Sequence, residues 1–159
     1  MMTAAESTTI NDTFVIERDF PHPPDRVFAA FAEPARKRRW YAEGDRDILE
    51  FAMDFSVGGN DRLHYRFSAP HPIAGSEIVN EASYADIVPG RRIIATAKMS
   101  LDGMPIMISL LTFEFLPSAT GTDLLLTNQS TFTDWPQGAE MIQQGWKTLL
   151  DHLEKELAR

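Results

Sequence analysis

The sequence predicts an α+β protein in which a curved antiparallel sheet of about six or seven strands wraps around one long C-terminal helix. Two observations carry this prediction. Apolar residues after Trp135 recur with the period of an amphipathic helix, and from Asp47 onward the chain alternates apolar and polar residues with a period of two. A single helix cannot cover so large a flat sheet. The sheet must therefore curl, and a cavity can remain between its concave face and the helix.

The C-terminal helix has a clear apolar face. That face is formed by Ile142, Trp146, Leu149, Leu150, Leu153 and Leu157. Over residues 139–158 the helix would extend about 30 Å, enough to cross a small domain. Gly145 lies inside it. Because a glycine inside a helix costs about 1 kcal/mol relative to alanine, we expect Gly145 to permit a close contact with a strand or with Trp40.

Two short helices are predicted after a first strand over residues 13–20. Pro23-Pro24-Asp25 opens the first helix, because proline suits a first helical turn and an acidic side chain there meets the positive end of the helix dipole. Pro34 ends that helix and begins a second one, which ends near Trp40. The long strand region follows these helices.

The remaining strands are joined by turns that contain glycine. They are predicted over residues 47–57, 63–67, 76–88, 91–99, 104–116 and 122–132. The first two of these strands carry their apolar residues at odd positions, which excludes a plain two-residue turn between them. A loop with a bulge, with glycine at positive φ, satisfies this pattern and explains Gly58 and Gly59.

One face of these strands is assigned to the interior, because the opposite choice would bury the charges of Arg92 and Lys98. The predicted inner face contains Ile78, Ala82, Tyr84, Ile93, Ala95, Ala97, Met99, Ile106, Ile108, Leu110, Thr112, Leu124, Leu126, Asn128, Ser130 and Phe132. Met107, Leu111, Phe113 and Phe115 would then point outward. Either these four form a homodimer interface, or the register of their strand is wrong.

Length and composition indicate one domain. At 159 residues with 43% hydrophobic content, the chain can bury one sizeable core but not two. Residues 1–11 are polar and unpatterned and are expected to be a disordered tail, which leaves residues 12–159 as the domain. The sequence has no long apolar run and no signal-peptide pattern at its start, so a cytoplasmic protein is expected.

Charge and motifs exclude several classes of function. A net charge of −8 opposes binding to nucleic acid or to an anionic membrane. The chain has no cysteine, its four histidines are scattered, and no HExxH, GxSxG, Walker or Rossmann pattern is present. We therefore expect no metal, no cofactor and no assigned catalytic residue. The classes of function that remain are binding of a small ligand and binding of a protein partner.

Several short segments together resemble a known family. They are PPDRVFAAF at 23–31, Trp40, DFSVGG at 54–59, YADIVP at 84–89, Gly121-Thr122 and GWKTLLDHL at 145–153. In this order, the segments resemble the SRPBCC superfamily of START-like, helix-grip proteins, and within it the bacterial branch similar to the C-terminal domain of the Hsp90 ATPase activator. Ser56, Ala82 and Asp86 depart from residues usual in that family. The resemblance implies a helix-grip fold with a cavity and carries over no catalytic set.

The leading functional prediction is that a small, mostly apolar ligand binds between the sheet and the C-terminal helix. The residues expected to line this cavity are Trp40, Phe51, Met53, Phe55, Tyr65, Phe67, Tyr84, Ala95, Ala97, Met99, Ile108, Leu110, Asn128, Ser130, Met141, Trp146 and Leu150. The small side chains of this set leave volume. The polar ones either bond to one another or orient a ligand.

Two other functions stay open. The resemblance implies a cochaperone-like module acting on an Hsp90-type ATPase. It would use an exposed surface such as the basic run at 36–39, which is otherwise expected to be a solvated face. The same fold also hosts cyclases and hydrolases. An enzyme of that type would need a perturbed carboxylate or histidine in the cavity. The candidates are Asp86 and Glu114, which the pattern places on the inner side, and His64, which it places on the polar side of its strand.

Overall fold

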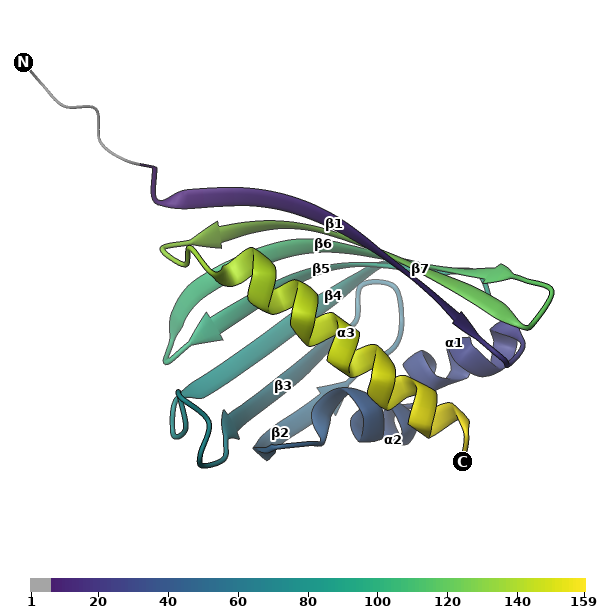
Figure 1. Ribbon diagram of the computed structural model, residues 1–159, viewed down its shortest axis with the longest axis horizontal. Coiled ribbons are helices and arrows are strands. Elements are labelled where there is room, and N and C mark those ends of the chain that lie inside the picture. Colours follow the sequence, from purple (N-terminus) through teal and green to yellow (C-terminus); the bar gives the residue numbers. More distant parts are fainter. Residues whose placement is uncertain (1–6) are drawn as a thin grey trace, which may run out of the picture.

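A computed structural model describes residues 7–159 as one curled sheet with a long helix in its concavity (Figure 1). The elements are β1 (Thr9–Phe20), α1 (Pro24–Ala32), α2 (Pro34–Lys37), the π-helical turn η1 (Arg38–Ala42), β2 (Arg46–Met53), β3 (Asn60–Phe67), β4 (Glu77–Val88), β5 (Arg92–Leu101), β6 (Met104–Pro117), β7 (Thr122–Thr133) and α3 (Gly138–Leu157). This confirms the predicted α+β helix-grip fold.

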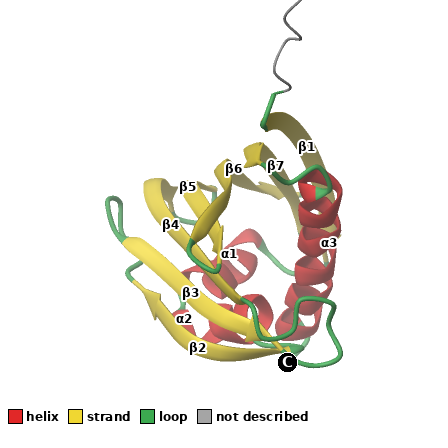
Figure 2. Cartoon of the chain, turned by 90° about the vertical axis from the view of Figure 1, so that its left-hand side faces the viewer, coloured by secondary structure: helices red, strands yellow, loops and turns green. Residues whose placement is uncertain are grey.

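The sheet has seven antiparallel strands in the order β1-β7-β6-β5-β4-β3-β2. Every neighbouring pair except β1 and β7 follows directly in sequence, so the sheet is built mainly from hairpins. The segment α1-α2-η1 carries the chain from the β1 edge to the β2 edge. Figure 2 shows the sheet curling around α3, with α1 and α2 at one end. In this arrangement α3 crosses the concave face and contacts η1, α1 and β1.

One end of the concave face is packed with aromatic rings. Phe31 lies 4.8 Å from Trp40 and 5.1 Å from Phe113 between ring centroids, and Phe28 lies 5.3 Å from Phe115. The indole Nε1 of Trp40 donates a hydrogen bond to the carbonyl oxygen of Ala30 at 2.8 Å, so its one polar atom is satisfied. Against these rings α3 presents its last apolar side chains, which are fully or almost fully buried: Leu150, Leu153 and Leu157.

The predicted inner face of β6 is wrong. Met107, Phe113 and Phe115 are buried, whereas Ile108 and Leu110 are 54% and 38% exposed on the outer face. The same alternation turns Ile106 and Thr112 away from the core and Leu111 toward it. The four residues offered as a homodimer interface therefore face the concave side of their own sheet.

A bulge explains the error in β6. The turn at Asp102-Gly103 pairs Leu101 with Met104, which alone would place even-numbered residues of β6 opposite the inward residues of β5. The register shifts between Met99 and Ser100, and Met99 then pairs with Met107. One extra residue in β6 thereby exchanges the two faces of the strand.

The range predicted for the disordered tail, residues 1–11, is too long. Thr9, Ile10 and Asn11 belong to β1 and pair with Thr133, Phe132 and Thr131 of β7. A strand needs backbone partners rather than apolar side chains, so the polar composition of this segment did not predict its pairing. The first six residues lie outside the part that the structure describes.

The glycine that lets α3 approach the sheet is Gly138, not Gly145. A Cβ added at Gly145 would meet nothing within 4 Å, whereas a Cβ at Gly138 would collide with the ring of Phe132. Gly138 is the first residue of α3 and follows the turn that leaves β7. The start of the helix, rather than its middle, is therefore held close to the strand. Within residues 7–159, no helix is both long and apolar enough to cross a membrane.

Candidate functional site

Small and polar residues form a row across the middle of the concave face. Strand pairing aligns Ser130 of β7, Ser109 of β6, Ala97 of β5, Ala82 of β4 and Asp61 of β3. Opposed residues of antiparallel strands point to the same face, so these five side chains share the concave side. Alanine and serine side chains are small, so they fill little of the space above the sheet along this row.

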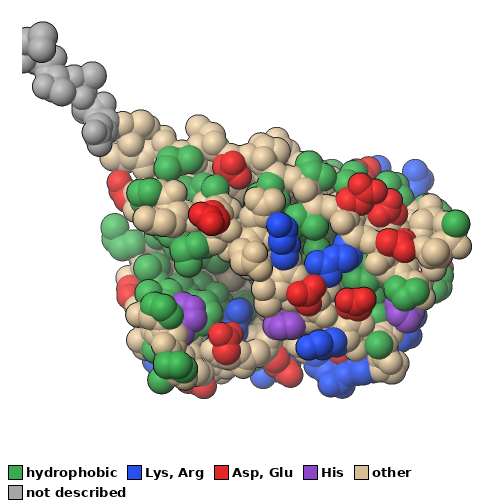
Figure 3. Space-filling view, in the orientation of Figure 1, with side chains coloured by type: hydrophobic (Ala, Val, Ile, Leu, Met, Phe, Trp, Pro, Cys, Tyr) green, Lys and Arg blue, Asp and Glu red, His purple; other side chains and the backbone are tan. Residues whose placement is uncertain are grey.

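This row borders the open end of the concave face. Next to it toward the packed end lies a row that contains Leu111, Ala95 and Tyr84, and on the other side lies a row that contains Met107 and Met99. Ala82, Ala97 and Met99 are only half-buried, although they lie on the inner side of central strands. Figure 3 shows a recess on the left of the molecule, beside α3, in which hydrophobic side chains gather. The N-terminal half of α3 thus leaves part of the sheet uncovered. We call this region the open cleft.

Trp146 of α3 marks the border between the packed end and the open cleft. Its ring lies 5.5 Å from Phe113 and 6.4 Å from Tyr41, measured between centroids. The side chain is half-buried, so it packs against the aromatic core without filling the cleft completely.

Three polar side chains of β6 and β7 form a buried group on the concave face. The Ser109 and Ser130 hydroxyl oxygens are 2.7 Å apart, and Ser130 donates to Oδ1 of Asn128. Asn128 is fully buried, yet its Nδ2 has no hydrogen-bond partner in the described part of the chain. The three side chains therefore bond to one another, as the first of the two sequence interpretations holds, but they leave one amide group unsatisfied. A buried donor without an acceptor is costly and is often satisfied by a ligand or by ordered water.

A second buried cluster joins α2 to strands β3 and β4. Lys37 Nζ lies 2.7 Å from Oδ2 of Asp61 and donates to the Tyr84 hydroxyl at 3.2 Å, while that hydroxyl donates to the same carboxylate oxygen at 2.6 Å. Burial, followed by the negative charge of Asp61, raises the pKa of Tyr84 far above its usual range. Tyr84 is therefore a fixed donor, and the lysine charge is balanced inside the protein.

Sequence reasoning missed the Lys37–Asp61 pair. Lys37 belongs to the basic run at 36–39, and Asp61 was taken as a turn residue. The alternation of β3 contained the signal, because Asp61 shares its face with Leu63 and Tyr65, which are both buried. An acidic residue at an inward position predicts a cationic partner from another element.

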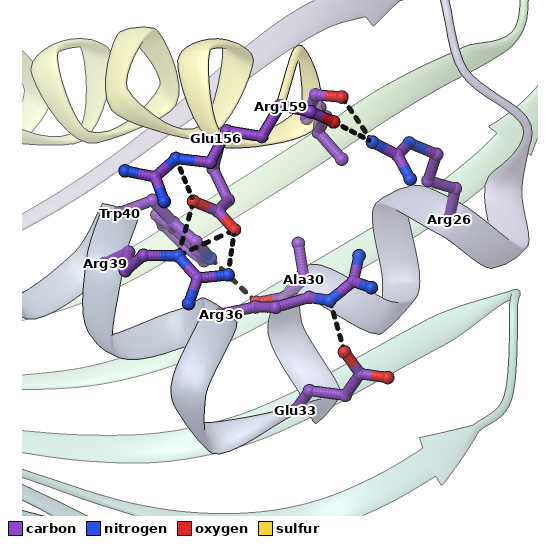
Figure 4. Close-up of polar contacts among 9 residues, drawn as sticks. Arg26, Ala30, Glu33, Arg36, Arg39, Trp40, Glu156 and Arg159 are labelled. Atoms are coloured by element: carbon purple, nitrogen blue, oxygen red, sulfur yellow. Dashed lines mark hydrogen bonds and ion pairs between the residues drawn. The ribbon is translucent and has the colours of Figure 1, made fainter.

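The rest of the basic run is also paired within the chain. Arg39 makes a bidentate contact with Glu156 of α3, with Nη2–Oε1 and Nε–Oε2 distances of 2.6 and 2.9 Å (Figure 4). Arg36 pairs with Glu33, and Arg38 lies 3.5 Å from Glu43. The run therefore fastens the helical segment to α3 and to its own flanks. Lys37 departs from the expected solvated face, whereas the side chains of Arg36, Arg38 and Arg39 remain 37%, 45% and 34% exposed. The hydrogen bond from Arg39 holds the pKa of Glu156 below its ordinary value.

The sequence-predicted lining residues divide into three groups. Those on the concave side are Phe51, Met53, Phe55, Tyr65, Phe67, Tyr84, Ala95, Ala97, Met99, Asn128, Ser130 and Trp146. Trp40 and Leu150 lie in the packed core, with 1% and 0% of their surface exposed. Ile108 and Leu110 lie on the outer face, and Met141 is 51% exposed on α3.

The candidates for enzymatic chemistry lie on the outer face. Asp86 pairs with Arg92 at 2.5 Å, and His64 pairs with Glu77 at 3.2 Å. Glu114 stands opposite Arg92 in the sheet, so the prediction that Asp86 and Glu114 face inward is wrong. A shallow depression of about 590 Å³ on that outer face is crossed by the Arg62–Glu81 ion pair. Within residues 7–159, no three His, Asp or Glu side chains are placed to hold a metal ion.

Comparison with known proteins agrees with the fold. Residues 21–158 match the sequence model of the family described as Activator of Hsp90 ATPase homolog 1-like protein. The structure is similar to a putative uncharacterized protein from Rhizobium leguminosarum, with 35% identity, a TM-score of 0.88, and 95% and 97% of the two chains covered. It is also similar to the Mll3558 protein from Rhizobium loti, with 40% identity, a TM-score of 0.83, and coverage of 94% and 99%.

A more distant similarity supports the fold alone. The solution structure of the AHSA1-like protein from Aeromonas hydrophila has 17% identity to this chain and a TM-score of 0.65, with 92% of each chain covered. No curated protein sequence matches the chain. The family match covers most of the chain, and two solved structures more than 30% identical to it span nearly its whole length. The chain belongs to the family of Activator of Hsp90 ATPase homolog 1-like proteins, within the helix-grip superfamily.

Proposed function

We propose that this protein binds a small, mostly apolar molecule in the open cleft between the N-terminal half of α3 and the concave face of β3 to β7. The observation that carries the proposal is the half-buried state of Met99 and Phe67 on the inner side of β5 and β3, beside the hydrophobic recess next to α3 (Figure 3). In a sheet that a helix covers completely, such residues would be buried. Their remaining exposure supports a binding surface that is mainly apolar.

The composition of the cleft supports a ligand rather than a second protein domain. Ligand sites combine apolar walls with a few placed polar groups. Here the apolar part comes from Met99, Phe67 and Trp146, and the polar part comes from the Asn128–Ser130–Ser109 group, whose free amide faces the same side of the sheet. These features suit a compact molecule that is wider than one side chain and carries few hydrogen-bonding groups.

Binding of the neutral dye Nile red, followed by its fluorescence and by native mass spectrometry, tests the proposal. The variant Ala97→Phe fills the floor of the cleft and is expected to weaken dye binding at least about tenfold, since an added ring removes the volume that the dye would occupy. The matched control is Thr96→Phe. Thr96 is exposed on the opposite face of the same strand, and this substitution is expected to leave binding unchanged.

Two results would overturn the proposal. Wild-type protein that shows no saturable dye binding would remove the function, and equal binding by Ala97→Phe and Thr96→Phe would place the dye elsewhere. A thermal unfolding curve for each variant separates loss of binding from loss of folding. If Ala97→Phe does not fold, Ala82→Leu serves the same purpose, because Ala82 pairs with Ala97 in the sheet.

A cochaperone role is the second candidate, and the description of the matching family favours it. Such a role would use another exposed surface, because the basic run is engaged within the chain and Met107, Phe113 and Phe115 of β6 are buried on its concave side. The ATPase rate of the Hsp90-type chaperone from the same cell, measured with and without this protein, tests the role. An unchanged rate at saturating protein would argue against it.

A further inference from the structure

An arginine stands at the mouth of the open cleft without an acidic partner. Arg46 is the first residue of β2 and pairs with Phe67 of β3, so it lies on the concave side with Tyr65 and Ile48. Its guanidinium carbon is 4.2 Å from the centre of the Tyr65 ring and 5.5 Å from that of Phe67. The side chain is half-buried, and its Nε is shielded from solvent with no hydrogen-bond acceptor among residues 7–159.

Arg46 differs from the other cations of the chain. The remaining half-buried cationic side chains in residues 7–159 have an acceptor: Arg18 bonds to Asp151, Arg26 to the carbonyl oxygen of Leu157, Arg36 to Glu33, Lys37 to Asp61, Arg39 to Glu156 and Arg92 to Asp86, and Arg62 to Glu50 and Glu81. Arg91 and Lys98, which have no acidic partner within residues 7–159, are exposed to water. Arg46 thus combines partial burial with an unmet hydrogen-bonding capacity.

The setting of Arg46 suits it for recognition. Aromatic faces hold a guanidinium in place through cation–π contact while leaving its edge free to donate. The positive charge acts inside the cleft, because it opposes the effect of burial on the phenol of Tyr65, whose pKa is nevertheless raised. His71 stacks on Phe67 at 3.8 Å and accepts a hydrogen bond from the Ile73 amide through Nδ1. The rim around Arg46 is therefore ordered and aromatic.

From this geometry we infer that the ligand of the cleft is an organic acid: an apolar body that lies on the Met99 side of the floor, with a carboxylate that Arg46 binds at the mouth. The inference deepens the proposed function and rests on it. A planar guanidinium matches a carboxylate through two parallel hydrogen bonds. A single arginine balances one negative charge, whereas a dianionic phosphate would keep an uncompensated charge in a protein whose net charge is −8.

A pair of probes that differ only in the head group tests the inference. Decanoate and 1-decanol share the same chain, and their competition with Nile red at pH 7.5 gives two dissociation constants. Wild-type protein is expected to bind decanoate more tightly than decanol. Arg46→Gln is expected to weaken decanoate about ten- to a hundredfold, the usual worth of a charge-assisted hydrogen bond in a shielded site, and to change decanol less than about threefold.

Two further variants serve as controls. Arg91→Gln removes an exposed arginine that has no acidic partner and is expected to leave both probes unaffected. Arg46→Lys keeps the positive charge but lacks the planar guanidinium that can form two parallel hydrogen bonds with a carboxylate. This variant is therefore expected to keep only part of the wild-type preference for decanoate. It also provides a second reading if Arg46→Gln does not fold.

Each outcome decides one of the two claims. Equal affinity of wild-type protein for acid and alcohol, or an equal loss of both in Arg46→Gln, would overturn the carboxylate inference and leave the apolar cleft intact. If neither decanoate nor decanol displaces Nile red, while Ala97→Phe still blocks dye binding, the inference that the ligand is an organic acid would also be rejected. Absence of Nile red binding to wild-type protein would instead remove the proposed function itself.

Discussion

The two ends of the concave face use the same strands and the same alternation of residues in different ways. At the packed end, Phe113, Phe115 and Leu126 interlock with α1 and the C-terminal half of α3 and are buried. At the open end, the corresponding inward positions of the central strands hold Ala82 and Ala97, and the surface remains half-exposed. The size of the inward side chains, rather than the fold, therefore decides which part of the helix-grip cavity is core and which part is cleft.

The difference between the ends predicts unequal costs for truncating an inward side chain. Phe115→Ala should lower the free energy of unfolding by about 3–5 kcal/mol, because it leaves a cavity among rings that cannot collapse into it. Met99→Ala at the open end should cost only about 1 kcal/mol, since its side chain is already half-exposed. Urea denaturation of both variants measures this contrast. Equal losses would mean that the open end is packed as tightly as the other.

The buried Lys37–Asp61–Tyr84 cluster should be nearly as sensitive. Asp61→Asn leaves the lysine charge buried without its counter-ion, which should cost about 3 kcal/mol. Glu81→Gln is the control, because Glu81 pairs with Arg62 on the exposed outer face, where an ion pair contributes at most about 1 kcal/mol. Chemical denaturation at low and high salt distinguishes the two pairs. Similar small losses would show that the cluster is well solvated.

The two glycines of α3 should respond in opposite directions. Gly138→Ala should destabilise the protein by about 1–3 kcal/mol, because its Cβ would collide with the buried ring of Phe132. Gly145→Ala has free space around the new methyl group and should stabilise the helix by up to about 1 kcal/mol. The melting temperatures of the two variants check this. A destabilised Gly145→Ala would restore the close contact that the sequence predicted there.

The smallest effect concerns acid stability. Since the folded pKa of Glu156 is lowered by Arg39, its contribution is fully present above the ordinary value of 4.5 and is lost as pH falls through the folded pKa. Wild-type protein should therefore lose stability below about pH 4.5, and Glu156→Gln should flatten that part of the stability curve. Glu154→Gln, an exposed position on the same helix, should leave the curve unchanged. An identical acid profile for wild type and Glu156→Gln would contradict this assignment.

Local patterns were sufficient for the helix-grip fold because each element carried its own signal. Pro24 and Pro34 begin the short helices, and the apolar period of α3 matches its burial along its C-terminal half. The inner face of β6 was not predictable from alternation, because both faces of the strand are apolar and one extra residue near Ile106 reverses them. A bulge is decided by pairing with the neighbouring strand, which no local pattern records.

The polar part of the site depended on contacts between distant segments. Arg46 precedes the strand predicted over residues 47–57, and only its position opposite Phe67 places it on the concave side. The same holds for Lys37, whose partner Asp61 lies on β3. The pairing of Ser109 with Ser130 likewise required the corrected register of β6. Sequence reasoning therefore placed most of the apolar candidates on the side of the sheet that is concave and missed the charged groups at its edges.

The most direct test of the cleft is to locate a bound molecule by nuclear Overhauser effects between decanoate and the methyl groups of the protein. If the ligand lies on the concave floor, cross-peaks are expected to the methyl groups of Ala97 and Met99 and none to those of Ile108 and Leu110 on the outer face. Cross-peaks to Ile108 and Leu110, with none to Ala97 and Met99, would contradict the assignment of the open cleft as the binding site.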